Sequence, residues 1–114
     1  MNVAAKSQIT ELADVFHLMG DPSRLSILLL VLEGPRAVGE IAAATGLSAS
    51  LVSHHLRLLR AGRLVRAERR GKWVFYAVED AHIRSVLTDM AEHVAELAPP
   101  RRVPRAKAKT AAGA

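Results

Sequence analysis

Apolar residues recur at helical spacing through the first third of the chain. Residues 8–19 place apolar side chains three and four positions apart, which predicts an amphipathic helix. Asp21 and Pro22 have the form of a helix N-cap followed by proline in the first turn, and this second helix is expected to reach about Glu33. The run 27–32 is apolar on all sides, so this helix is expected at the centre of a core.

Two shorter helical segments follow. The pattern predicts a helix over 38–45 that ends at Gly46, and a second helix that Ser48 caps and that reaches about Ala61, before Gly62. Glycine supplies the backbone freedom that a tight turn between two helices needs. The pair has the dimensions of a helix-turn-helix.

The periodicity then changes from helical to β. Residues 64–69 and 73–78 are β-prone stretches on either side of Arg70-Gly71, which predicts a hairpin. Helical spacing returns over 80–97, where one apolar stripe is expected to pack into the core. The predicted order is α-α-α-α-β-β-α, a mainly α fold with a β-hairpin wing, or winged helix-turn-helix.

The 114 residues are enough for one compact domain. We expect a flexible N-terminus over 1–7, a winged helix-turn-helix domain over 8–98 and a basic disordered tail over 99–114. The absence of cysteine excludes thiolate metal sites and thiol redox chemistry. No apolar run approaches a membrane span and the N-terminus has no apolar signal core, so a cytoplasmic protein without a membrane partner is expected.

The net charge of +5 is unevenly distributed along the chain. Residues 101–114 hold five basic residues and no acids, and the rest of the chain balances 11 basic against 11 acidic residues. Residues 57–72 contain seven basic residues and one acid, whereas 79–96 contain five acids and one base. One surface is therefore suited to an anion, and the other is suited to a cation or is a solvated helix face.

Projection of the helix after Ser48 at 100° per residue separates two faces. Leu51 and Val52 begin an apolar face, on the edge of which His55 lies, whereas His54 points outward. The outward face is narrow, with small residues and donors that suit base edges and phosphates of double-stranded DNA. A helical packing motif with an incidental basic face is the alternative. The candidate DNA-binding residues on this helix and the wing tip are Ser48, Ser50, Ser53, His54, Arg57, Arg69, Arg70 and Lys72.

The last predicted helix contains four candidate metal ligands: Asp80, His82, His93 and Glu96. The two histidines lie within ~20° of each other on one helix face but ~16 Å apart along the axis. One zinc ion holds its ligands at ~2 Å, so a shared ion would need ligands from a second chain. Two antiparallel copies of the helix would give two equal N2O2 sites without an open position, which suits sensing and not catalysis.

The spacing by itself leaves another interpretation open. Asp80 is also a good N-cap, and the two histidines with Glu96 could lie on a solvated or dimer face.

Four stretches of the chain resemble the ArsR/SmtB family of winged-helix metal-sensing repressors. They are GDPSRLSIL (20–28), LSASLVSHHLRLLRAGRLV (47–65), RRGKWVFYAV (69–78) and DAHIRSVLTDMAEHVAE (80–96). The resemblance covers residues 8–97. Its D-x-H…H-x-x-E pattern matches the family's site on the last helix, and the resemblance therefore implies that Asp80, His82, His93 and Glu96 are metal ligands.

This resemblance implies a homodimer with the first and last helices at its interface. It implies that the metal-free dimer binds an inverted-repeat operator as a repressor, and that metal binding releases the DNA. Two histidines and two carboxylates suit Zn²⁺, with Co²⁺ or Ni²⁺ as alternatives. No nucleophile lies beside an acid–base pair, so neither an enzyme nor a small organic substrate is expected. A family member with a silent metal site and an architectural protein that coats DNA are the alternative functions.

Overall fold

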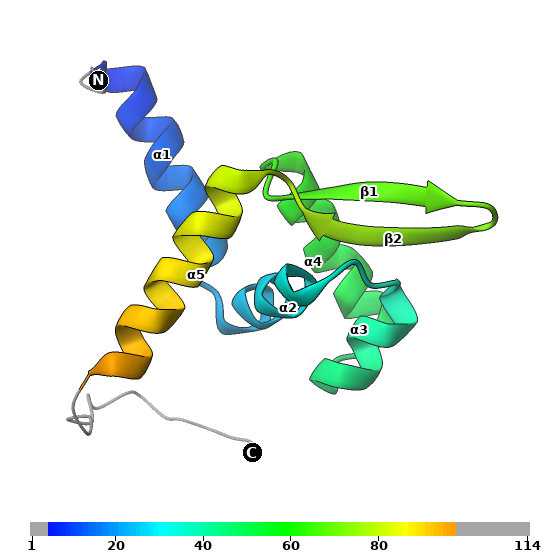
Figure 1. Cartoon of the computed structure of the whole chain (residues 1–114). Helices are drawn as coiled ribbons and strands as arrows, with labels where there is room; N and C mark the ends of the chain where they lie inside the picture. Colours follow the sequence, from blue (N-terminus) through cyan, green and yellow to red (C-terminus); the bar gives the residue numbers. More distant parts are fainter. Residues whose placement is uncertain (1–4, 98–114) are drawn as a thin grey trace.

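The computed structural model describes residues 5–97, and it has the predicted order of elements (Figure 1). The predictions for residues 1–4 and 98–114 lie outside this range. The elements are α1 (Lys6–Met19), α2 (Pro22–Glu33), α3 (Val38–Thr45), α4 (Ala49–Ala61), β1 (Val65–Arg70), β2 (Trp73–Val78) and α5 (Ala81–Glu96). The winged helix-turn-helix prediction is confirmed. Helix α1 starts at Lys6, inside the segment 1–7 that was expected to be flexible.

Side-chain caps begin three of the helices, as their sequences predict. Asp21, Ser48 and Asp80 each accept a 3.0 Å hydrogen bond from the backbone N–H three residues later. Each bond satisfies a backbone donor that has no partner inside the helix. Gly46 ends α3 with a φ of 79°, in the left-handed region that glycine adopts at low cost. Gly62 also ends α4, as predicted, but its φ is −85°, and the residue there with positive φ is Arg63, at 61°.

Helix α2 passes through the centre of the core, as its apolar sequence predicts. Ile27, Leu28 and Val31 have no exposed surface. Buried side chains from the other elements surround them; these are Met19, Ile41, Val52, Leu56, Leu59, Leu64, Val65, Val78 and Leu87. Within the described part of the chain, no single helix is long and apolar enough to cross a membrane; only the pair α1 and α2, bent by 87°, passes that test.

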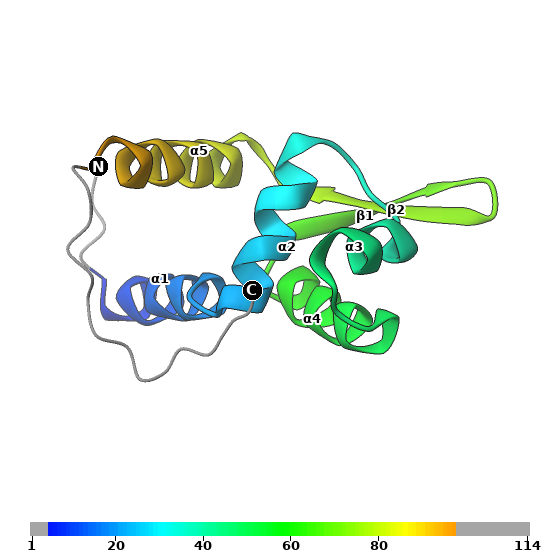
Figure 2. The ribbon, with the colours of Figure 1, turned by 90° about the horizontal axis from the view of Figure 1, so that it is seen from below.

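Helices α1 and α5 extend on one side of α2, opposite the wing formed by β1 and β2 (Figure 2). The expectation that the α5 stripe packs into the core is only half right. Ile83 and Leu87 pack there, but the C-terminal half of the stripe is exposed. We call the exposed apolar side chains of the two helices the α1–α5 face; they are Ile9, Leu12, Phe16, Met90, Val94 and Leu97, each more than half exposed.

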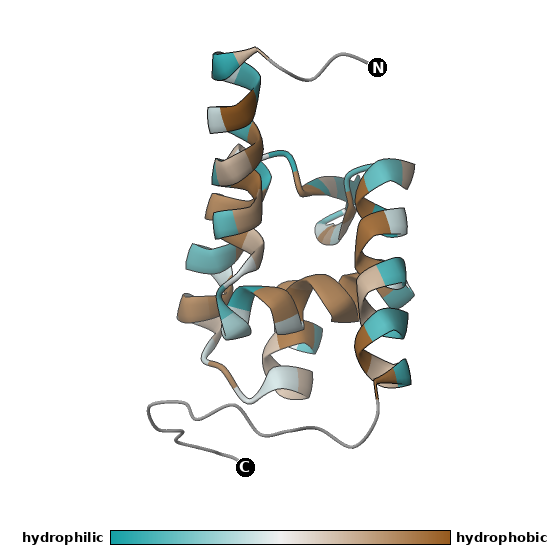
Figure 3. Cartoon of the chain, turned by 90° about the vertical axis from the view of Figure 1, so that its left-hand side faces the viewer, coloured by the Kyte–Doolittle hydropathy of each residue, from teal (hydrophilic) through white to brown (hydrophobic). Residues whose placement is uncertain are grey.

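This apolar face borders a groove of about 560 Å³ between α1, α2 and α5. Phe16, Leu25, Leu29 and Met90 are among the residues that line the groove. Figure 3 looks onto this side and shows hydrophobic bands on both outer helices, with the apolar α2 between them. A continuous apolar surface of this kind is typical of an interface with another polypeptide.

The wing is a two-stranded antiparallel hairpin in which Arg70 pairs with Trp73 and Val65 pairs with Val78. The turn is therefore Gly71-Lys72, one residue later than predicted, and Gly71 has a φ of 63°. A two-residue turn that begins with glycine matches the natural twist of a hairpin. The backbone of Arg36 extends the sheet by a bridge to Tyr76, with hydrogen bonds of 2.8 and 3.0 Å.

Candidate nucleic-acid interface and candidate metal ligands

Helix α4 exposes a polar face and buries an apolar one, largely as its sequence predicts. Val52, Leu56 and Leu59 are buried in the core. The opposite face exposes the small and polar side chains of Ser50, Ser53, His54 and Arg57, which we call the polar face of α4. Leu51 is an exception, because it was assigned to the buried side and is 40% exposed.

Ser48 differs from the other candidates on α4. Its hydroxyl oxygen accepts a 3.0 Å hydrogen bond from the N–H of Leu51 and so fixes the start of the helix. Its O–H proton is still available to donate to a phosphate. Ser48 also lies at the exposed N-terminus of α4, where the helix dipole favours an anion.

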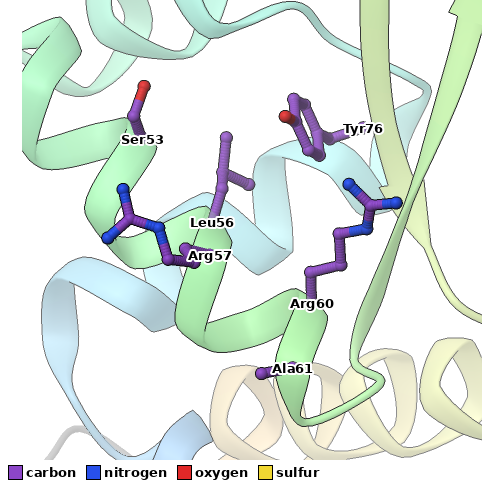
Figure 4. A pocket seen from close by; sticks show the side chains of 6 residues that line it. All are labelled: Ser53, Leu56, Arg57, Arg60, Ala61 and Tyr76. Atoms are coloured by element: carbon purple, nitrogen blue, oxygen red, sulfur yellow. The ribbon is translucent and has the colours of Figure 1, made fainter.

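A hollow of about 540 Å³ separates α4 from β2 (Figure 4). The Ser53 hydroxyl and the Arg57 guanidinium lie on its α4 side, the Tyr76 ring lies on its β2 side, and the Arg60 side chain extends from α4 toward Tyr76. Arg60 and Tyr76 were missing from the predicted set. The spacing of Ser53, Arg57 and Arg60, at i, i+4 and i+7, could have revealed Arg60. Tyr76 enters the hollow through strand pairing, which has no local signal in the sequence.

A network of charged groups on the wing changes the roles expected for its arginines. Glu68 forms ion pairs with Arg66 at 2.7 Å and with Arg70 at 2.9 Å. Hydrogen bonds from Arg70 first, and then from Arg66, hold the pKa of the Glu68 carboxyl below its usual range. Arg70 also lies over the Phe75 ring, 5.0 Å from its centroid. Arg70 therefore turns back along the strands and is engaged by Glu68, and its role in DNA binding stays a prediction.

Arg69 and Lys72 remain as exposed cations at the tip of the wing. Within residues 5–97 neither of them forms an ion pair with an acidic side chain. The guanidinium group of Arg69 donates one long hydrogen bond, of 3.5 Å, to the carbonyl oxygen of Gly71. Both cations are thus free to contact phosphate groups.

The adjacent histidines of α4 lie in different environments, as the helical projection predicts. His54 is exposed, whereas His55 is 9% exposed and its Nδ1 has no hydrogen-bond partner in the described structure. Burial lowers the pKa of His55, and the positive charge of Arg24 and the neighbouring His54 act in the same direction, against the carboxylate of Asp21. His55 is therefore a neutral core residue near neutral pH.

The four predicted metal ligands all lie on the solvent-exposed surface of α5 and its N-cap. Asp80 Oδ1 accepts the N–H of Ile83, which leaves its other carboxylate oxygen available to a ligand. Asp80 and His82 are at the N-terminal end of α5, and His93 and Glu96 are at its C-terminal end. Within residues 5–97 of one chain, no three histidine, aspartate or glutamate side chains are grouped closely enough to hold a metal ion. The donors fit zinc chemically, but one chain alone does not bring them together.

The fold and the polar face of α4 define a winged helix-turn-helix DNA-binding protein. Residues 21–67 match the family of bacterial regulatory proteins called the arsR family. The chain is 36% identical over 94 residues to a transcriptional repressor SmtB homolog of Synechocystis, covering 82% of this chain and 71% of that one. It is 33% identical over 95 residues to a cadmium resistance regulatory protein CadC homolog of Staphylococcus aureus, covering 82% and 78%.

Solved structures agree with these sequence matches. A homodimeric winged helix-turn-helix domain from Mycobacterium bovis, described as a possible ArsR-family regulator, superposes with a TM-score of 0.73 at 29% identity. The match covers 84% of this chain and 91% of that one. The chain therefore belongs to the ArsR family of bacterial regulatory proteins. It is a transcriptional regulator and not an enzyme, as the sequence predicts.

Proposed function

We propose that this protein is a zinc-responsive transcriptional repressor that acts as a homodimer. In this proposal the metal-free dimer binds an inverted-repeat operator through the polar face of α4 and the wing. Zinc, or alternatively cobalt or nickel, is held by Asp80 and His82 of one chain together with His93 and Glu96 of its partner, and DNA affinity is then low.

One observation carries the proposal. The four donors are exposed and divided between the two ends of α5, so that a complete set requires a second, antiparallel copy of the helix. The apolar α1–α5 face supplies a reason for a second copy to bind there. The relatives named as a repressor and as a cadmium resistance regulator are consistent with control of transcription by a metal.

Contacts within one chain connect the ligand-bearing helix to the DNA-binding helix. Arg84, on the first turn of α5, donates a 3.0 Å hydrogen bond to the carbonyl oxygen of Leu32 on α2. Leu87 of α5 belongs to the same core cluster as Leu28 of α2 and Leu56 of α4. A divalent cation held by donors from two chains would fix the separation of the two α5 helices. A displacement of α5 would then reach α4 through α2, and the spacing of the two α4 helices on DNA would change.

The direct test is a titration of the dimer bound to an operator duplex, which is first selected by the protein from a random pool. Added zinc is expected to lower DNA affinity by ~5–150-fold, the usual range of allosteric coupling. The variant with His82→Ala and His93→Ala should lose this response, whereas Glu92→Ala, an exposed acid on the same helix, should keep it. Unchanged DNA affinity with zinc, or a full response in the double variant, would contradict the proposal.

Three further measurements separate the alternative functions and the candidate metals. Absence of stoichiometric zinc or cobalt binding would indicate a family member with a silent metal site. Loss of all DNA binding on deletion of residues 101–114, without preference among sequences, would indicate a DNA-coating protein. A cobalt absorption spectrum distinguishes the metals, because tetrahedral nitrogen and oxygen bands favour zinc and weak octahedral bands favour nickel or cobalt.

A further inference from the structure

Trp73 is the only tryptophan of the chain, and 59% of its surface is exposed at the tip of the wing. Tryptophan has a large apolar surface, and where it stays exposed to solvent this surface contributes little to the stability of the fold. The α1–α5 face does not account for it, because that face lies on the opposite side of α2 from the wing (Figure 1). The exposed indole is therefore available to a partner other than a second copy bound at that face.

The strand pairing leaves the ring of Trp73 free. Arg70 is its direct cross-strand neighbour and would be the natural residue to cover it. The guanidinium of Arg70 instead binds Glu68 and lies over Phe75, two residues further along the same face of the strand. The network on the wing thus draws the neighbouring side chain away from the indole.

The charges beside Trp73 indicate what the partner is. Lys72 directly precedes Trp73 in the turn, and Arg69 pairs with Val74 on the opposite face of the hairpin. Within the described chain neither cation is neutralised by an acid. The only acid on the strands, Glu68, is already engaged by two arginines. The tip of the wing therefore carries an exposed apolar ring together with two free cations. This combination suits a surface in which apolar edges lie between rows of phosphates. The minor groove of DNA is such a surface, with deoxyribose walls between two phosphate backbones.

We propose that Trp73 is an apolar DNA contact of the wing, inserted against the sugar edges of the minor groove, while Lys72 beside it and Arg69 on the other face of the hairpin bind phosphates. This inference rests on the DNA-binding function proposed above and adds a specificity-determining residue to it. The width of the minor groove depends on sequence, so the indole makes affinity sensitive to base pairs that α4 does not read.

The single tryptophan makes the contact directly observable. We expect its fluorescence to shift or be quenched when the full-length protein binds the selected duplex, with binding followed independently by the anisotropy of a dye on the DNA. Trp73→Ala should weaken binding about tenfold, within the range known for aromatic contacts to nucleic acid, and Trp73→Phe should restore most of the loss. The exposed position means that both variants should keep the melting temperature of the parent protein.

Two controls identify the kind of contact. Lys72→Ala should reduce the slope of log affinity against log salt by about 1, whereas Trp73→Ala should leave that slope unchanged. Inosine·C pairs present the same minor-groove edge as A·T pairs. Replacement of the flanking A·T pairs by inosine·C pairs should therefore preserve the contribution of Trp73 to DNA affinity. Replacement by G·C pairs adds an amino group in that groove and should reduce it.

Each other outcome has a defined meaning. Duplex binding with unchanged tryptophan fluorescence and equal affinity of Trp73→Ala overturns the inference while the DNA-binding function stands. A response that is larger with single-stranded oligonucleotides than with the duplex also overturns it, in favour of base stacking. Failure of the parent protein to bind any duplex contradicts the proposed function itself.

Discussion

The guanidinium group of Arg66 donates a 2.7 Å hydrogen bond to the carbonyl oxygen of Val78, the last residue of the wing. It donates a second bond of 3.1 Å to the carbonyl oxygen of Glu79, and its other side is paired with Glu68. One side chain thus joins the first strand of the wing to the residue before Asp80, which caps α5. The wing and the candidate ligand helix are held together at this junction.

Replacement of Arg66 by glutamine should lower the free energy of unfolding by about 1 kcal/mol, because charge-assisted hydrogen bonds are lost from a side chain that is 48% exposed. Urea denaturation measures this change. Arg69→Gln is the matched control on the same strand and should stay within about 0.5 kcal/mol of the parent protein. Equal stability of the two variants would mean that the Arg66 junction contributes nothing.

Gly46→Ala should destabilise the protein by about 1–2 kcal/mol. The φ of 79° at this position is unfavourable for a residue with a β-carbon, although no atom lies within 4 Å of one placed there. Gly39→Ala, in the first turn of α3, is the control. It also meets open space, has an ordinary helical backbone, and should stabilise the protein by up to about 1 kcal/mol. Thermal unfolding of both variants tests whether the two substitutions change the stability in opposite directions.

Acid should destabilise the fold through His55. The pKa of this residue is lowered in the folded protein from its ordinary 6.5, chiefly by burial. The unfolded chain therefore binds more protons as the pH falls below 6.5, so stability is lost until the pH passes the folded pKa. His55→Gln should reduce the slope of stability against pH between about pH 7 and pH 5. Denaturant unfolding across this range gives the slopes.

Phe16→Glu should weaken homodimerisation by about a hundredfold or more, because it places an unpaired charge in the α1–α5 face. Trp73→Glu serves as the control, since Trp73 has similar exposure but lies on the wing. Sedimentation velocity over a range of protein concentrations measures both. A parent protein that is monomeric at all concentrations, or an equal effect of the two substitutions, would contradict dimerisation through this face.

Mixed dimers test whether two chains share each metal ion. A chain with Asp80→Ala and His82→Ala, and another with His93→Ala and Glu96→Ala, should each fail to bind zinc. A mixture allowed to exchange subunits forms dimers in which one complete set of four donors is restored. Zinc binding should therefore reappear on mixing, as measured by competition with a chelating dye. Continued absence of binding in confirmed mixed dimers would exclude the shared arrangement.

Most of the fold could be predicted from the sequence because its signals are local. The caps at Asp21, Ser48 and Asp80 each involve a hydrogen bond across three residues, and Gly46 acts through its own φ angle. The hairpin was predicted from its β-prone stretches and glycine turn, with an error of one residue in the register of the turn. The alternation of buried and exposed positions in α4 likewise follows from helical geometry.

The sequence by itself thus determined the elements, their order and the polar face of α4. Tertiary structure decided which surfaces remain free. The apolar periodicity of α5 could not tell that Met90 stays more than half exposed among residues 5–97, since a helix shows which face is apolar but not what lies opposite it. In the same way, only strand pairing and side-chain packing turn Arg70 onto Glu68 and Phe75, place Tyr76 in the hollow beside α4, and leave Trp73 exposed.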